Sequence, residues 1–258
     1  MNKTFKYLPV LFLALIMAMA YSTTEAQSKK HAENNPPMVG FNQTASDVKA
    51  ISIADEVMEA MGGRKAWDKT RHISWNFFNA RTLIWDRYTG NVRVETTDNK
   101  FKALLNIHTM EGKVMKDGQL LTQPDSVKKY LEQAKSMWIN DSYWLVMPYK
   151  LKDSGVTLTY IKEDTTEAGA PADVLQLTFE GVGRTPQNKY HVYVDKDSKV
   201  VTQWSFFREA AKETPDFTTP WKDYKDYGKI KLSGDRGERK ITAINVDKKL
   251  PETAYTTF

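Results

Sequence analysis

Residues 137–153, MWINDSYWLVMPYKLKD, constrain the fold more than any other stretch of the chain. Pro148 must end a helix there, because it lacks an amide proton and restricts the residue before it. Asn140 and Asp141 are suitable helix caps, so we predict a short helix that runs from them to Met147. Most of the side chains are large and apolar, and they need an apolar partner. Since much of the remaining chain has the pattern of antiparallel strands, we predict that this helical plug lies inside a strongly curved sheet.

The first residues have the pattern of a secretory signal peptide. Lys3 and Lys6 give a basic start, and residues 8–20 form an apolar run too short to span a bilayer comfortably. An uncleaved membrane anchor is the alternative. Cleavage fits after Ala20 or after Ala26, and we favour Ala26 because the following residues are polar. The chain is then expected to divide into a signal peptide at 1–26, a flexible leader at 27–45 and one domain at 46–258.

The sequence contains no cysteine. This excludes disulfide bonds, a thiol nucleophile and the lipid-modified cysteine that anchors bacterial lipoproteins. The net charge is +5, but charges of both signs alternate, as in residues 195–199 and 222–226, whereas a nucleic-acid site needs clustered Lys and Arg. We therefore expect a soluble periplasmic monomer with no nucleic-acid partner.

Hydrophobic periodicity predicts one helix followed by a sheet. Apolar residues recur every three or four positions over residues 47–61, and Gly62 and Gly63 provide a helix end. From residue 70 onward apolar and polar residues alternate, most clearly over residues 101–107. Short turns such as Asp117-Gly118 join these runs, so the strands should form an antiparallel meander.

The second half of the domain should contain a helix and further strands. The helix is predicted over residues 124–138 and leads into the plug. Strands are predicted at residues 156–161, 174–179, 190–194, 200–207, 229–232 and 239–246. We expect an exposed loop at residues 164–173, and a long loop at residues 209–227 that is either functional or poorly ordered.

No sequence motif for catalysis or metal binding is present. The four histidines, His31, His72, His108 and His191, lack ligand spacing, and residues 181–186 lack the third glycine of a dinucleotide loop. Two carboxylates that act as acid and base come together only in the fold, so that chemistry stays open. We therefore expect no cofactor and no metal, and we name no catalytic residue.

Several predicted strands carry apolar side chains on both faces. In residues 200–207, Trp204 and Phe206 oppose Val201 and Phe207. A sheet with one solvated face should alternate cleanly between apolar and polar residues. The pattern favours a sheet that is simply covered on both faces, and it leaves open a core on one face and a ligand chamber on the other.

Three segments resemble those of an uncharacterised Bacteroidetes family of exported LolA-like proteins. They are MGGRKAW at 61–67, RTLIWD at 81–86 and YWLVMPYKLKD at 143–153, and DYKDYG at 223–228 is a weaker fourth. That family is related to the LolA/LolB-like lipoprotein-carrier superfamily. The resemblance implies an α+β fold in which a strongly curved antiparallel sheet, an open half-barrel, wraps around a few helices and encloses a cavity for acyl chains. The carriers use an arginine near this cavity, and Arg71, Arg81, Arg87 and Arg93 all fit that role, so none is assigned.

The resemblance implies a non-enzymatic binding or carrier protein for a lipid, an acyl chain or a lipoprotein, with transient membrane contact. The alternatives are an enzyme that acts on envelope lipid or glycan through unidentified carboxylates, and a non-catalytic envelope interaction module. Candidate cavity residues are large and apolar, because aromatic and methionine side chains give broad, adaptable contact. They are Trp138, Tyr143, Trp144 and Met147 from the plug, and Trp75, Phe77, Leu105 and Trp204 from the strands. The same residues would also fill a solid core, and that interpretation stays open.

Overall fold

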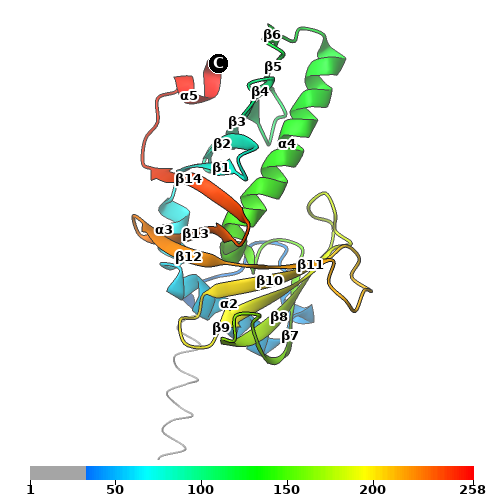
Figure 1. Cartoon of the computed structure of the whole chain (residues 1–258), viewed down its shortest axis with the longest axis vertical. Coiled ribbons are helices and arrows are strands. Elements are labelled where there is room, and N and C mark those ends of the chain that lie inside the picture. The colour runs from blue at the N-terminus through cyan, green and yellow to red at the C-terminus, as the bar shows by residue number, and fades with distance from the viewer. Residues whose placement is uncertain (1–32) are drawn as a thin grey trace, which may run out of the picture.

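The computed structural model describes residues 33–258. The signal peptide predicted at residues 1–26 lies outside the described residues. The described chain has an α+β fold of two antiparallel sheets and a few helices (Figure 1). Within residues 33–258, no helix combines the length and the apolar character needed to cross a membrane.

The strands follow one another in two groups along the chain. Their bounds are β1 His72–Phe77, β2 Arg81–Asp86, β3 Asn91–Thr96, β4 Phe101–Asn106, β5 Gly112–Lys116, β6 Gln119–Leu120, β7 Val156–Thr165, β8 Pro171–Phe179, β9 Lys189–Asp195, β10 Val201–Phe207, β11 Phe217–Pro220, β12 Lys222–Tyr227, β13 Ile230–Arg236 and β14 Arg239–Asp247. Sheet A is 9-stranded, in the order β12-β13-β14-β1-β2-β3-β4-β5-β6. Sheet B is 5-stranded, in the order β11-β10-β9-β8-β7. The predicted meander is confirmed, since each strand from β1 to β6 pairs with the next.

The two sheets are joined where the chain bends at Trp221. Strand β11 ends in sheet B at Pro220, and β12 begins in sheet A at Lys222. Trp221 itself is 1% exposed, and its amide donates to the Thr202 carbonyl at 2.8 Å. Each sheet keeps two free edges, so the assembly is an open, strongly curved surface and is not closed into a barrel.

The strand predictions differ from the structure in two places. The exposed loop expected at residues 164–173 is shorter, because β7 and β8 form a long hairpin that turns at residues 166–170. The long loop expected at residues 209–227 contains β11 and β12. Strand β12 escapes recognition because it is an edge strand of alternating charges, and an edge strand needs no apolar face.

The helices pack against the sheets. Their bounds are η1 Gln43–Ala45, α2 Val48–Ala60, α3 Arg64–Lys69, α4 Pro124–Val146, η2 Met147–Lys150 and α5 Thr253–Thr256, where η marks a 3₁₀ helix. Helix α2 confirms the prediction for residues 47–61. Helix α4 also ends before Pro148, as expected for a residue without an amide proton.

The short helix predicted from Asn140 and Asp141 to Met147 is wrong. Helix α4 runs without a break through both residues and ends at Val146. Asn140 is exposed on the helix, and Asp141 is fully buried in an ion pair with Arg81. A tertiary contact therefore explains the aspartate that we interpreted as a local cap.

Residues 33–45, assigned to the leader, lie against the domain. Asn35 is 4% exposed, and its amide nitrogen donates to Asp55 on α2 at 2.8 Å. Lys152 forms a 2.6 Å ion pair with the same carboxylate and donates to the Asn35 carbonyl at 2.6 Å. This buried group links the leader, helix α2 and the segment that follows η2.

We predict that Asp55→Ala lowers the free energy of unfolding by about 3–5 kcal/mol, because it leaves the Lys152 ammonium buried without its carboxylate. The matched control is Lys162→Ala, which breaks the exposed Lys162–Asp164 pair and should cost less than about 1 kcal/mol. Urea denaturation at pH 7 measures both. Equal losses for the two variants would contradict a stabilising role of the buried pair.

Candidate ligand-binding site

Helix α4 lies along the inner face of sheet A. That face carries Trp75, Leu83, Val94 and Ala103 in one row across β1 to β4. All four side chains are buried, and α4 contacts β3, β4 and β5. In Figure 1 the long green helix runs beside the cyan strands of this sheet. The interface between α4 and sheet A is therefore the main apolar contact of this part of the protein.

A buried ion pair fastens the C-terminal half of α4 to β2. Arg81 Nε and Nη2 donate to the two carboxylate oxygens of Asp141, each at 2.6 Å. Asp141 is fully buried, and burial raises its pKa even though the Arg81 hydrogen bonds act in the opposite direction. The Arg81 guanidinium also lies 5.1 Å from the ring centre of Phe77. This pair fixes the helix laterally, which apolar contacts alone do not do.

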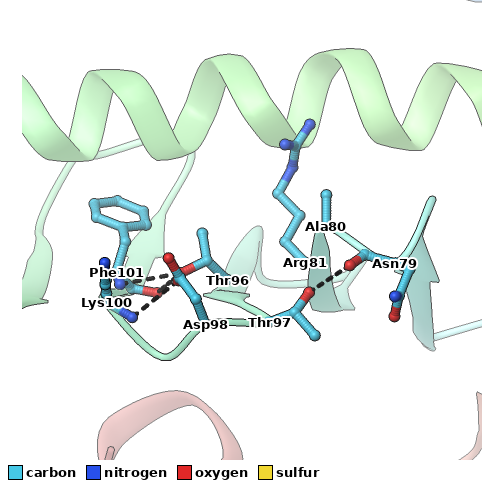
Figure 2. A pocket seen from close by; sticks show the side chains of 8 residues that line it. All are labelled: Asn79, Ala80, Arg81, Thr96, Thr97, Asp98, Lys100 and Phe101. Atoms are coloured by element: carbon cyan, nitrogen blue, oxygen red, sulfur yellow. Dashed lines mark hydrogen bonds between the residues drawn. The ribbon is translucent and has the colours of Figure 1, made fainter.

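A cleft of about 460 Å³ opens beside this ion pair. It lies where the β1–β2 turn and the β3–β4 turn approach α4, and Figure 2 shows Arg81 pointing from the cleft toward the helix. Its lining combines charged, polar and aromatic side chains: Asn79, Ala80, Arg81, Thr96, Thr97, Asp98, Lys100 and Phe101. The end of the helix–sheet interface is therefore amphiphilic. None of the eight predicted cavity residues lines this cleft.

Four of the predicted residues meet in an aromatic cluster at the junction of the two sheets. Trp144 contacts Trp204 with ring centres 4.8 Å apart and Phe77 with ring centres 6.4 Å apart. Tyr143 stacks on Trp204 at 5.9 Å. Trp144 also stacks on Phe217 at 5.8 Å with 12° between the ring planes. The C-terminal half of α4 thus brings the plug residues onto strands of both sheets.

The other four predicted residues lie elsewhere along the same helix. Trp138 is half-buried and packs edge-on against Trp85, with ring centres 5.2 Å apart. Trp85 shares a cross-strand row with Leu105 on the inner face of sheet A. Trp75 and Met147 are buried in the core at 1% and 0% exposure. In this structure all eight side chains pack against one another or against the core.

Of the four arginines considered from the sequence, Arg81 reaches helix α4. Arg71 pairs with Asp86, and Arg93 pairs with Glu95. Arg87 donates to the carbonyls of Trp67 and Thr70, and its burial lowers its pKa to about 10.

Sequence reasoning missed Arg236 on β13. This residue is 3% exposed, and its guanidinium lies 3.5 Å from the ring centre of Trp221. It donates to the Trp144 carbonyl at the end of α4 at 2.7 Å. Burial lowers its pKa to about 9, and within residues 33–258 no carboxylate pairs with it. In the sequence it stands in the turn-like segment GDRG, which gives no sign of a buried cation.

We predict that Arg81→Met lowers the free energy of unfolding at pH 7 by about 3–5 kcal/mol, because the Asp141 carboxylate stays buried without a cation. A carboxyl whose pKa is raised by folding binds its proton more tightly in the folded state, so this loss should shrink from pH 7 to pH 5. The control is Arg81→Met with Asp141→Leu, which removes both charges and should recover most of the stability. Urea denaturation of the three proteins that shows equal losses in both variants would exclude the ion pair as the cause.

No family model and no curated protein matches the sequence. Among solved structures, a DUF1329 family protein from Desulfovibrio piger is similar with a TM-score of 0.47 and 10% identity, over 81% of this chain and 97% of that one. An outer membrane lipoprotein-sorting protein domain from Vibrio parahaemolyticus has a TM-score of 0.38 and 11% identity, over 80% and 96%. A LolA superfamily protein from Nitrosomonas europaea has a TM-score of 0.33 and 8% identity, over 79% and 97%. At these TM-scores and identities, the likeness contributes nothing to the assignment of a family or of a site.

Proposed function

We propose that this protein is a non-enzymatic binding or carrier protein for an apolar or amphiphilic ligand such as a lipid, an acyl chain or a lipoprotein. One observation carries the proposal: helix α4 lies on the inner face of an open sheet, with half-buried aromatic side chains along it. The signal peptide expected at residues 1–26 would export the protein, so we propose that it binds this ligand in the periplasm. The lipoprotein-sorting and LolA names of similar structures describe those proteins, and the same class of ligand is proposed here.

The ligand would lie between α4 and sheet A. Met137, Trp138 and Trp144 are only half-buried in that interface, so their contacts leave room for exchange. An acyl chain could replace the apolar contacts between the helix and the sheet with equivalent apolar contacts of its own. Aromatic and methionine side chains adapt to chains of different shape. A polar head group would remain in the cleft beside Arg81 and Lys100.

The buried carboxylates favour binding over carboxylate catalysis. Asp55 pairs with Lys152, Asp86 with Arg71, and Asp141 with Arg81, while Asp173 accepts from the Tyr160 hydroxyl at 3.1 Å. Each of these contacts joins two elements of the fold. An acid and a base for hydrolysis need access to a substrate proton. These four carboxylates are buried and already form contacts that stabilise the fold.

We predict that ligand binding moves α4 away from sheet A. The chain has no cysteine, so spin labels attached to Asn79→Cys and Lys128→Cys report on these two exposed positions alone. Addition of palmitate should shift the label–label distance to larger values, because the chain enters the interface. A control pair within sheet A, Thr82→Cys and Lys100→Cys, should keep its distance. Palmitate binding without any change in the first pair would contradict this location.

We also predict that truncation separates the ligand-contacting residues from the core. Ile73→Ala removes a fully buried side chain and should cost about 2–5 kcal/mol of stability without changing fatty-acid uptake per folded molecule. Trp144→Ala should cost less stability, because Trp144 is half-buried, and should reduce uptake of a fluorescent fatty acid. Thermal melting and a fluorescence titration measure both effects. Severe unfolding of the Trp144 variant with unchanged uptake would show that this residue belongs to a solid core.

A further inference from the structure

The interior at the junction of the two sheets contains hydrogen-bond donors without acceptors. The Tyr143 hydroxyl, the indole nitrogens of Trp204 and Trp221, and Nε of Arg236 are shielded from solvent, and none has a partner among residues 33–258. Buried polar side-chain atoms in proteins are normally paired, so a group of unpaired ones needs an explanation.

These four side chains form one continuous donor cluster. The rings of Tyr143 and Trp204 are 5.9 Å apart, and those of Trp204 and Trp221 are 5.5 Å apart. The Arg236 guanidinium lies 3.5 Å from the ring centre of Trp221. Trp204, Trp221 and Arg236 are each at most 3% exposed. The donors therefore belong to one local environment at the end of α4.

The unpaired atoms share one property, the ability to donate a hydrogen bond. Within residues 33–258 the unpaired buried side-chain atoms are five indole nitrogens, two guanidinium nitrogens and two hydroxyls. All of them can donate a hydrogen bond, and no carboxylate or amide oxygen is among them. The molecule that completes this environment must supply acceptors.

We propose that the donor cluster binds carbonyl oxygens of an ester or amide in the ligand. This inference rests on the proposed function and names the chemical class of the ligand. A sugar would bring several hydroxyl donors, and the cluster offers them one acceptor, the Tyr143 hydroxyl oxygen. A carboxylate or phosphate would be attracted by the Arg236 cation, but Nη1 and Nη2 of that guanidinium already donate to Ser233, Asp235 and Trp144, which leaves only Nε. An anion would also have to be stripped of water among aromatic ring faces, which are electron-rich and disfavour it. An uncharged carbonyl accepts two hydrogen bonds at a much smaller loss of hydration.

Two stacked rings separate the donor cluster from solvent. Trp144 contacts Trp204 within the cluster and stacks on Phe217, which is 39% exposed. A ligand would reach Trp204 by displacing these two side chains. The acyl chain of a ligand held here would run along α4 into its interface with sheet A, which places the carbonyl and the chain in adjoining sites.

The test compares a diester with a diether of the same chain length. Binding of 1,2-dioctanoylglycerol and 1,2-di-O-octylglycerol to the full protein is measured by isothermal titration calorimetry. The diester should bind about tenfold more tightly, since only it carries the carbonyl acceptors. Tyr143→Phe and Trp204→Phe each keep a ring and remove a donor, so each should reduce this preference to about threefold or less. The control Trp67→Phe, which alters a ring stacked on Tyr149 outside the cluster, should leave the preference unchanged.

The possible results separate this inference from the proposed function. Equal affinity for diester and diether would overturn the donor cluster as a carbonyl site and leave lipid binding in place. Failure of both compounds and of palmitate to bind would overturn both proposals. Tighter binding of octanoate than of the diester would also overturn the carbonyl assignment. The melting temperature of unliganded Tyr143→Phe should not fall, because the hydroxyl that it loses has no partner.

Discussion

The burial of helix α4 between the two sheets is the contact on which the rest of the structure depends. Residues 124–138 of the helix cover the inner face of sheet A, where Trp85 and Phe101 meet Trp138 and Tyr130. Its C-terminal half contacts Trp204 on sheet B. Without the helix, the inner face of a nine-stranded open sheet would be exposed to water. The two sheets therefore share one apolar partner, and any movement of α4 changes the packing of both sheets.

The two halves of α4 are held by different kinds of force. The C-terminal half is fixed by directional contacts, namely the Arg81–Asp141 ion pair and the hydrogen bond from Arg236 to the Trp144 carbonyl. The N-terminal half is held mainly by apolar packing and by two polar contacts at the surface, a 2.7 Å hydrogen bond from Lys116 to the Tyr130 hydroxyl and an exposed ion pair between Arg184 and Glu132. Apolar contacts are non-directional and can be exchanged for those of an acyl chain. We therefore expect opening to begin at the N-terminal half and to pivot near Asp141.

The sequence predicted the parts of the fold that depend on local periodicity. The meander of sheet A and helix α2 follow from alternation and from three- and four-residue spacing. Asp141 was misinterpreted as a cap, because its partner Arg81 lies 60 residues away along the chain. The contact of Arg236 with Trp144 spans 92 residues, and Trp221 stands in a segment without apolar alternation. The candidate residues Tyr143, Trp144 and Trp204 were selected as large apolar side chains. Their unpaired donors are a property of the packed interior that no pattern in the sequence contains.

The choice of residue types in the aromatic cluster bears on whether it is only a core. Phenylalanine at positions 143 and 204 would supply similar apolar contact without a buried donor. Tyrosine and tryptophan at these positions leave a hydroxyl and an indole N–H unpaired, which costs about 1–3 kcal/mol for each such group. Packing alone therefore gives no reason for the polar atoms, since the apolar alternative is more stable. A ligand that brings acceptors removes that cost when it binds. The donors therefore lower the stability of the empty protein and raise its affinity for such a ligand.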